Sequence, residues 1–237
     1  MKLHAIHTEI FEQQADLAAF IVKFIPNMPE NAILAVSSKL VALWQGDVLP
    51  YKDTAQKEAL IIQQSQAALK TPLAWFTIKD GMVMTNAGID ESNANGKLIC
   101  LPDCYTCAAQ LRSQLQKKWQ VRNLGIVVTD SMILPLRAGV IAAAVGYAGF
   151  VGVKDLRGQQ DIYGKPLQTT LVNIADSLAS AAALLMGEAA EQTPLCVIEE
   201  APVVFTDKTN RNEIQYPLEN DLYTPLLRAA QLIKEEK

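Results

Sequence analysis

The sequence predicts an α+β fold. Apolar runs with the length of strands and amphipathic runs with the period of helices follow one another along the 237 residues without a regular strand–helix–strand alternation. The dipeptide Asp80-Gly81 interrupts an apolar run and predicts a hairpin of adjacent strands. Half of the residues are hydrophobic, which is enough for a substantial core. We therefore expect one domain over residues 1–237, with a weaker boundary in the polar stretch after Phe205.

The first half of the chain predicts one helix and several strands. Apolar residues repeat at helical spacing over residues 13–25, and Pro26 ends this helix. The stretch AILAVSSKLVALW, residues 32–44, is an apolar strand that runs into a polar turn at Ser37-Ser38-Lys39. The other predicted strands are the arms of the hairpin at 74–84 and the short run at 96–102.

The second half of the chain is predicted to contain both strands and helices. Asp103 opens a helix that continues through Lys118, and the buried strand LGIVVTD then ends at Asp130. The long stretch 166–187 begins as a strand and becomes a helix that Gly187 ends. The remaining predicted elements are a central strand at 194–200 and an amphipathic helix at 223–237.

Charge and composition narrow the functional classes. The net charge of −4 argues against a nucleic-acid partner bound through a broad basic face. The start of the chain shows no secretion signal, and the charge-free stretch 138–153 is too short for a spanning helix, so we expect no membrane partner. Four cysteines do not form a disulfide framework in a chain of this length. We therefore expect a cytoplasmic location.

Two acidic positions are candidate metal ligands. Asp90 lies in the oxygen-rich turn NAGIDESN, residues 86–93, and Asp130 ends a strand with Ser131 beside it. A carboxylate and a hydroxyl side by side suit hard cations such as Mg²⁺ or Mn²⁺, which prefer oxygen ligands. The alternative is structural, because aspartate is common in turns and at helix starts: Asp90 then caps a turn and Asp130 caps a helix.

Two further stretches could contact an anionic ligand. In DLRGQQDIYG, residues 155–164, glycines permit close backbone approach, and Arg157 could hold a phosphate or carboxylate at two points. A surface loop with an internal Asp–Arg pair explains the same residues. Ser38 and Lys39 could bind a nucleotide phosphate, although the glycine spacing of a Walker motif is absent and a polar strand–helix turn is the simpler interpretation.

The cysteines and histidines offer weaker hypotheses. Cys100, Cys104 and Cys107 have the spacing C-x₃-C-x₂-C, which could contribute to a zinc site if a fourth ligand were near, but buried thiols are the simpler alternative. Neither His4 nor His7 neighbours a nucleophile, so the sequence gives no support to nucleophilic hydrolysis.

Four segments in order resemble the coenzyme F-420-0:L-glutamate ligases, the γ-glutamyl ligases of the deazaflavin pathway. They are VSSKLVALWQG at 36–46, NAGIDESN at 86–93, VVTDSMILPLRAG at 127–139, and the long stretch from Asp155 to Glu188. The last segment is the most specific. Its matching positions are Asp155, Gly158, Asp161, Tyr163, Gly164, Leu167, Thr170, Ala175, Asp176, Leu178 and Gly187.

The resemblance implies a family-specific α+β fold, an intertwined homodimer, and a GTP- or ATP-dependent ligase that needs Mg²⁺ or Mn²⁺. It implies that L-glutamate is joined to an acceptor carboxylate activated as an acyl phosphate. The residues it implies as metal ligands are Asp90, Asp130, Ser131 and Glu188, and those for the nucleotide are Ser38, Lys39 and Asn93. Arg157 or Lys165 would then hold the glutamate or the acceptor.

Departures from the family pattern leave the substrate open. The run ILPLRAG keeps Pro135, Arg137 and Gly139 but lacks an arginine and a tryptophan usual there, and Leu43 replaces a usual lysine. IHTEIF replaces an expected nucleotide loop near the N-terminus. A folate acceptor is therefore an alternative to a deazaflavin. A paralogue that only binds nucleotide or metabolite, and a zinc-binding scaffold, are alternatives to the enzyme.

Overall fold

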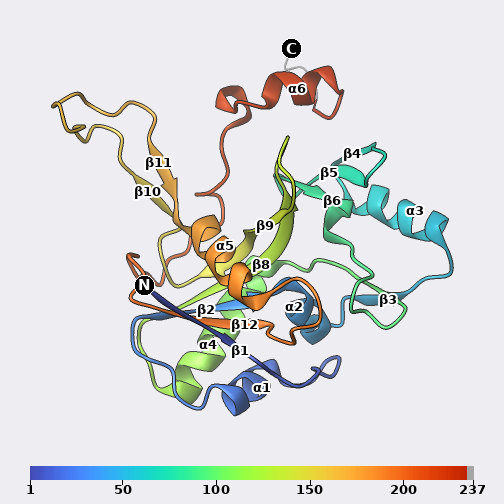
Figure 1. The fold of residues 1–237 in the computed structure, drawn as a ribbon, viewed down its shortest axis with the longest axis horizontal. Helices are drawn as coiled ribbons and strands as arrows, with labels where there is room; N and C mark the ends of the chain where they lie inside the picture. Colours follow the sequence, from blue (N-terminus) through green and yellow to red (C-terminus); the bar gives the residue numbers. More distant parts are fainter. Residues whose placement is uncertain (234–237) are drawn as a thin grey trace.

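A computed structural model describes residues 1–233 and has a five-stranded sheet at its centre (Figure 1). Its strands, in spatial order, are β1 (Lys2–Ile6), β12 (Leu195–Glu199), β2 (Ala32–Ser37), β8 (Leu124–Ile133) and β9 (Val140–Ala148). Strands β2 and β8 run parallel, whereas the other three pairs of this sheet are antiparallel. The parallel pair matters for function because both of its strands end at the same edge of the sheet.

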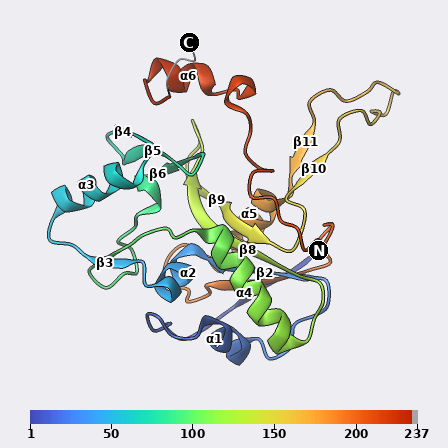
Figure 2. The same cartoon turned by 180° about the vertical axis from the view of Figure 1, so that it is seen from behind.

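Helices cover both faces of this sheet. The helices α1 (Leu17–Phe24) and α4 (Cys104–Trp119) cover one face, and α5 (Ile174–Met186) covers the other (Figures 1 and 2). Side chains alternate along a strand, so Leu34 and Val36 pack toward α1 and α4, while Ile33 and Ala35 pack toward α5. Each face therefore carries its own apolar core.

A second group of elements lies beside the central sheet (Figure 1). It contains the two-stranded sheet of β3 (Val48–Pro50) with β7 (Lys97–Ile99), the three-stranded sheet of β4 (Ala67–Lys70), β5 (Trp75–Lys79) and β6 (Met82–Thr85), and the helix α3 (Thr54–Gln64). The helix α2 (Ser38–Gln45) joins the two groups, because Leu40 and Val41 pack in the core of the central sheet and Ala42 packs with Val48. A short 3₁₀ turn, Asn86–Gly88, follows β6 and leads toward Asp90.

Two segments extend from the body. The strands β10 (Val153–Asp155) and β11 (Leu171–Asn173) form a hairpin arm whose loop projects away from the sheet (Figures 1 and 2). After β12 the chain is tied back to the body, where Arg112 pairs with Asp207 at 2.8 Å and the Tyr147 hydroxyl donates to Glu213. It then passes a 3₁₀ turn at Leu218–Asn220 and ends in α6 (Thr224–Ala229).

Much of the predicted secondary structure is confirmed. The chain has the mixed α and β content expected, with the hairpin at Asp80-Gly81, the helix capped by Asp103 and the strand-to-helix segment that Gly187 ends. None of the helices in residues 1–233 combines the length and apolar character that crossing a membrane requires. The expectation of one domain stays a prediction.

Four boundaries were wrong. The first helix begins at Leu17 rather than residue 13, because Asp16 caps it by accepting from the Ala19 amide. Helix α2 begins at Ser38, directly after β2, where a turn was expected. Strand β8 continues past Asp130 to Ile133, because β9 pairs with it over that length. The last helix covers Thr224–Ala229 only, and residues 234–237 lie outside the described part.

Close packing at Gly146 gives a first test of the fold. A Cβ at Gly146 would lie 2.4 Å from the Cys104 carbonyl carbon, so β9 and the start of α4 approach through a missing side chain. We expect Gly146→Ala to lower the free energy of unfolding by roughly 2–3 kcal/mol through overpacking. At Gly158 a Cβ would meet no atom within 4 Å, but φ is +83°. Gly158→Ala should therefore cost only about 1 kcal/mol. Urea unfolding of both variants checks the order, and a smaller loss for Gly146→Ala would contradict it.

Candidate active site

Polar side chains meet where the parallel strands β2 and β8 end. Helix α2 starts immediately after β2, so Ser38 and Lys39 lie on its first turn beside the end of β8. The Ser38 hydroxyl donates to Asp130 Oδ1 at 2.8 Å. The Lys39 Nζ lies 2.7 Å from Asp90 Oδ2. Two carboxylates that are far apart in the sequence are thereby held by adjacent residues of one helix.

The turn containing Asp90 is fixed at several points. Its backbone exchanges two hydrogen bonds with Ile99, of 3.0 and 2.8 Å, so Asp90 extends the edge of β7. Its carboxylate accepts from the Ser92 amide at 2.9 Å and from the Ser92 hydroxyl at 2.7 Å. The side-chain amide of Asn93 donates through Nδ2 to the Ala189 carbonyl at 3.2 Å. This turn therefore bridges α2 and the segment after α5.

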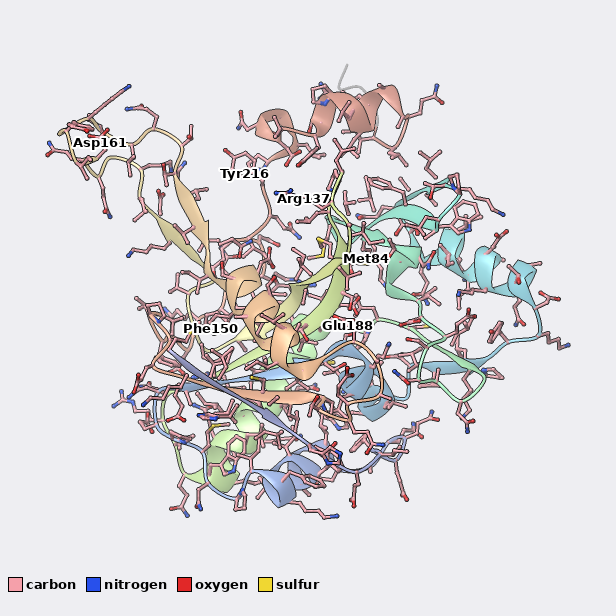
Figure 3. The ribbon with its side chains drawn as sticks, in the orientation of Figure 1. Met84, Arg137, Phe150, Asp161, Glu188 and Tyr216 are labelled. Atoms are coloured by element: carbon pink, nitrogen blue, oxygen red, sulfur yellow. The ribbon has the colours of Figure 1, made fainter. Side chains whose placement is uncertain are left out.

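Glu188 joins the same region from the other face of β8. The Ser131 hydroxyl donates to Glu188 Oε2 at 2.7 Å. Because β8 runs on to Ile133, the neighbours Asp130 and Ser131 point to opposite faces of the strand. The expectation that they lie side by side was wrong. Figure 3 shows Glu188 near the middle of the molecule, where α5 ends beside the sheet.

Burial and local charges set the ionisation of the two aspartates differently. Burial raises the pKa of Asp130 to about 6, although the hydrogen bond from Ser38 and the charge of Lys39 act in the opposite direction. Burial also opposes ionisation of Asp90, but the hydrogen bonds from Lys39 and Ser92 outweigh it and lower the Asp90 pKa. Asp130 is therefore the carboxylate that lacks sufficient compensation for its negative charge.

A β-bulge positions the end of β8. The register between β8 and β9 shifts between Val128 and Thr129, immediately before Asp130. On β9 the Ala144 amide, opposite Thr129, donates to Asp176 Oδ1 of α5 at 2.9 Å. Bulges commonly re-aim side chains beside active sites. Asp176 matches the family pattern, but its sequence position gives no sign that it anchors this strand.

The donor set suits a hard divalent cation, but it is not gathered around one point. Over residues 1–233, no three His, Cys, Asp or Glu side chains are close enough together to hold one metal ion. The oxygens present are the carboxylates of Asp90, Asp130 and Glu188 and the Ser131 hydroxyl. Mg²⁺ in nucleotide-dependent enzymes commonly uses one or two carboxylates and completes its shell with phosphate oxygens and water. These residues fit that mode rather than an all-protein cage.

Comparison with known proteins identifies the family. The model of the family described as F420-0:Gamma-glutamyl ligase matches residues 5–200. The chain belongs to the F420-0:gamma-glutamyl ligase family. Members join an amino acid through an amide bond, so this chain is an enzyme of the ligase class.

Relatives named coenzyme F420:L-glutamate ligase match over different lengths. The one from Methanopyrus kandleri is 43% identical over 77% of this chain and 79% of its own. The one from Methanocaldococcus jannaschii is 37% identical over 89% and 91%. The match to the relative from Methanococcus maripaludis strain C7, 38% identical, spans 58% of this chain and 55% of that protein.

Two predicted substrate residues of the ligase lie elsewhere. Arg157 and Lys165 are on the loop of the hairpin arm, where the Arg157 guanidinium pairs with Asp155 Oδ2 at 2.6 Å. Figure 3 shows Asp161, between them in sequence, at the outer end of this arm, far from Glu188. Within one chain, Arg157 and Lys165 therefore do not lie beside the carboxylates of the site. Their roles in substrate binding stay predictions.

The cysteines of the ligase form no metal site in the described residues. Cys100, Cys104, Cys107 and Cys196 are all free and buried, and burial raises the pKa of Cys107 to about 11. Since no three potential ligands gather within residues 1–233, the zinc-scaffold hypothesis has no support there. Protonated, buried thiols that pack in a core explain these residues.

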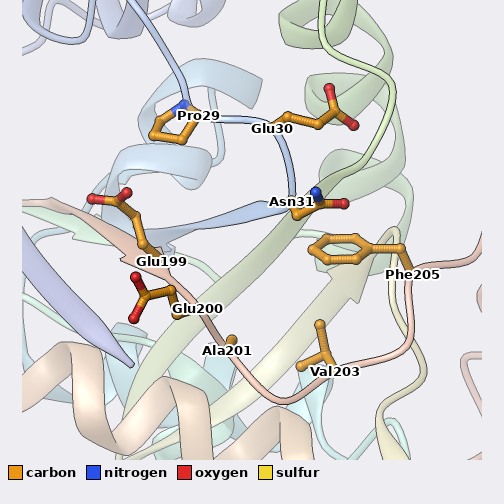
Figure 4. Close-up of a pocket in the computed structure, with 8 residues that line it drawn as sticks. All are labelled: Pro29, Glu30, Asn31, Glu199, Glu200, Ala201, Val203 and Phe205. Atoms are coloured by element: carbon orange, nitrogen blue, oxygen red, sulfur yellow. The ribbon is translucent and has the colours of Figure 1, made fainter.

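Two cavities lie outside the cluster of polar residues. The larger, of about 410 Å³, is lined by Pro29, Glu30, Asn31, Glu199, Glu200, Ala201, Val203 and Phe205 (Figure 4). It lies where β2 begins, about 20 Å from where β2 ends. Its carboxylates already have partners: Glu30 accepts from the Arg122 and Asn123 amides, and Glu200 pairs with Lys2. A smaller cavity of about 200 Å³ lies between α3 and the β3–β7 sheet.

The raised pKa of Asp130 predicts a pH-dependent stability. Its folded pKa of about 6 exceeds the ordinary aspartate pKa of 3.8, so the folded protein binds more protons between these pH values and loses stability as the pH rises through them. Asp130→Asn removes this loss. Because the residue keeps some solvent contact, we expect a gain of about 2 kcal/mol at pH 8 in chelator, and almost none near pH 3.5.

The control for Asp130→Asn is Asp155→Asn. Asp155 is exposed, and its hydrogen bonds with Arg157 lower its pKa to about 2, which is the opposite direction. Asp155→Asn should therefore give no gain at pH 8. Thermal unfolding of the metal-free proteins at both pH values measures the difference. If Asp130→Asn is no more stable than the parent at pH 8, the buried carboxylate does not destabilise the fold as inferred.

Proposed function

We propose that the protein is a nucleotide- and divalent-metal-dependent γ-glutamyl ligase that adds L-glutamate to the carboxylate of coenzyme F-420-0 or folate. The observation that supports it is that Ser38 and Lys39 of α2 contact Asp130 and Asp90 at the ends of the parallel strands, while Glu188 contacts Ser131 on the other face of β8. The names of the relatives favour the F-420 acceptor. The departures at 133–139 and at Leu43 leave folate as the second acceptor to test.

The proposed reaction has two transfers. An oxygen of the acceptor carboxylate attacks the γ-phosphorus of GTP or ATP, the bond to the β-phosphate oxygen breaks, and a nucleoside diphosphate leaves. The glutamate amine then attacks the acyl carbon, the carbon–oxygen bond to phosphate breaks, and the departing phosphate takes the amine proton. No covalent bond to the protein is required.

The residues have separate tasks in this proposal. Asp90 and Asp130 would hold Mg²⁺ or Mn²⁺ on the α2 side of β8, and Glu188 with Ser131 on the α5 side. The cation would supply neutralisation of the phosphate charge. Lys39 would move its ammonium from Asp90 to a phosphate oxygen, and Ser38 and the first-turn amides of α2 would bind the same phosphates. Asn93 would hold the turn at 86–93, beside the proposed nucleotide site, against the segment after α5.

We also propose a homodimer, because several apolar side chains are exposed together with the arm. Ile162 and Tyr163 at the arm are 90% and 89% exposed, and Leu136 beyond β8 is fully exposed. Large exposed apolar residues commonly mark interfaces. In a dimer the arm could carry Arg157 and Lys165 to the site of the second copy. The four free, buried cysteines support a proposed cytoplasmic location.

The dimer gives a prediction. Sedimentation of the parent should give the mass of two chains, and the double variant Ile162→Asp with Tyr163→Asp should shift the equilibrium to one chain. Ile10, which is 80% exposed in the loop before α1, provides the control Ile10→Asp, which should leave the mass unchanged. A monomeric parent at micromolar concentration would contradict the dimer.

An acceptor panel tests the activity. Purified protein with Mg²⁺ or Mn²⁺, L-glutamate and GTP or ATP should convert coenzyme F-420-0 or tetrahydrofolate to a glutamylated product, detected by mass. Asp130→Asn and Glu188→Gln should lower kcat by roughly 10²–10³, the range for removing one transition-state stabiliser. Glu200→Gln, outside the cluster, should keep the parent rate. Tight nucleotide binding without turnover, unchanged by Asp130→Asn, would instead favour a non-catalytic binding protein.

A further inference from the structure

A left-handed turn precedes Asp90. Asn86, Ala87 and Gly88 have φ values of 53°, 54° and 69°, so three consecutive residues adopt the conformation that side chains other than glycine and asparagine avoid. Ala87 is fully buried. A Cβ at Gly88 would lie 2.8 Å from the Cβ of Leu101, so this position requires glycine for space as well. Such strain persists only where neighbouring groups enforce it, and it is concentrated at functional sites.

The neighbouring groups come from the β5–β6 hairpin. Thr77 is fully buried, and its hydroxyl donates to the Met84 carbonyl at 2.7 Å while accepting from the Ala87 amide at 2.9 Å. Lys79, two residues along the strand and thus on the same face, donates to the Leu101 carbonyl at 3.1 Å and reaches the Ala87 carbonyl at 3.4 Å. Asn86 Oδ1 accepts from the Trp75 amide at 3.0 Å.

The turn fixes the direction in which the chain reaches the site. The Ile89 amide closes it on the Asn86 carbonyl at 2.9 Å, and the next residue is Asp90, whose backbone pairs with Ile99. A turn that left the left-handed region would rotate the chain between β6 and Asp90. The carboxylate would then lose its place beside Lys39 and Ser92.

We propose that Thr77 is a positioning residue of the ligase: its buried hydroxyl holds Ala87 in the left-handed conformation and thereby sets Asp90 for cation binding. Lys79 and Asn86 support the same turn. This inference rests on the proposed metal-dependent function only for its link to the cation, since the contacts that hold the turn stand without it.

Three substitutions separate positioning from general stability. Thr77→Val keeps the shape but removes both hydrogen bonds, and Thr77→Ser keeps the hydroxyl. Ala87→Gly makes the left-handed conformation accessible without Thr77. In the parent the turn is already left-handed, so Ala87→Gly alone should not change Asp90, but it should restore the turn in the Thr77→Val background. Such recovery is expected because glycine raises the population of molecules in which the turn is left-handed.

Two measurements read the turn and the site. Hydrogen exchange of peptides covering residues 86–93 should accelerate roughly tenfold in Thr77→Val, which is the effect expected from one lost buried hydrogen bond. Mn²⁺ affinity, followed by electron paramagnetic resonance, should fall by roughly the same factor. Thr77→Ser should stay within about twofold of the parent, and Thr77→Val with Ala87→Gly should regain at least half of the loss on a logarithmic scale.

The hairpin provides matched controls. Thr71 also donates through its hydroxyl, to the Ala74 carbonyl, and Asp80 also has a positive φ of 52°, but within the described residues neither forms a hydrogen bond to residues 86–90. Thr71→Val and Asp80→Gly should leave exchange at 86–93 and Mn²⁺ affinity unchanged. Asn86→Ala, which loses the acceptor for the Trp75 amide, replaces Thr77→Val if that variant does not fold.

The outcomes distinguish a positioning role of Thr77 from a contribution to overall stability alone. Unchanged exchange at 86–93 and unchanged Mn²⁺ affinity in Thr77→Val, with only a lower melting temperature, would overturn the proposal. Failure of the parent to bind Mn²⁺ would remove the proposed metal-dependent function instead. In that case faster exchange at 86–93 in Thr77→Val, reversed by Ala87→Gly, would still support the role of Thr77 in the turn, and its absence would overturn that role.

Discussion

The parallel pairing of β2 with β8 is the constraint on which the site depends. Its register sets Ser37 opposite Thr129, so the residues that follow, Ser38 and Asp130, meet at one edge of the sheet. In an antiparallel pair the same residues would end at opposite edges, about 20 Å apart for a strand of six residues. The start of α2 directly after β2 is equally necessary, because a longer connection would carry Lys39 away from Asp90.

The strand between Asp130 and Glu188 also limits the electrostatic cost of the site. Three carboxylates gathered around one point would repel each other in the absence of a cation. Here the alternation of side chains along β8 directs Asp130 and Ser131 to opposite faces, and Glu188 contacts only the latter. The Lys39 ammonium compensates Asp90 on the near face. Without a cation, the three carboxylates therefore do not repel one another at a single point. Asp130 is the one whose ionised form is destabilised by burial.

The sequence predicted local features well and spatial relations poorly. The cap at Asp103, the glycine that ends α5 and the hairpin at Asp80-Gly81 follow from residue types at fixed offsets, and all three are present. The acidic candidates came from their motifs, and their metal-binding roles stay predictions; the structure places Asp90 and Asp130 beside the start of α2 and Glu188 beside Ser131. The opposite orientation of Asp130 and Ser131 was missed, because it depends on β9 extending the strand.

Contacts between residues far apart in the sequence could not be predicted from any single segment. The anchoring of β9 by Asp176 joins residues 32 positions apart, and Thr77 acts on Ala87 through a hairpin whose register sets the spacing. The arm shows the converse case. Its motif is the most specific in the chain, yet it places Arg157 and Lys165 away from the carboxylates of the same chain. Motif specificity indicates relationship, whereas position within one subunit depends on topology.

Alanine at position 87 shows why strain can persist beside a functional residue. The left-handed conformation costs an alanine roughly 1–2 kcal/mol, which glycine would avoid. Glycine would also lose the burial of one methyl group, worth about 0.8 kcal/mol, and gain unfolded-state entropy worth about 0.4–1 kcal/mol. The two sides nearly cancel, so global stability hardly distinguishes the residues. The difference lies in how the turn is held, because alanine depends on the contact with Thr77 to stay in the left-handed conformation, whereas glycine adopts it without that contact.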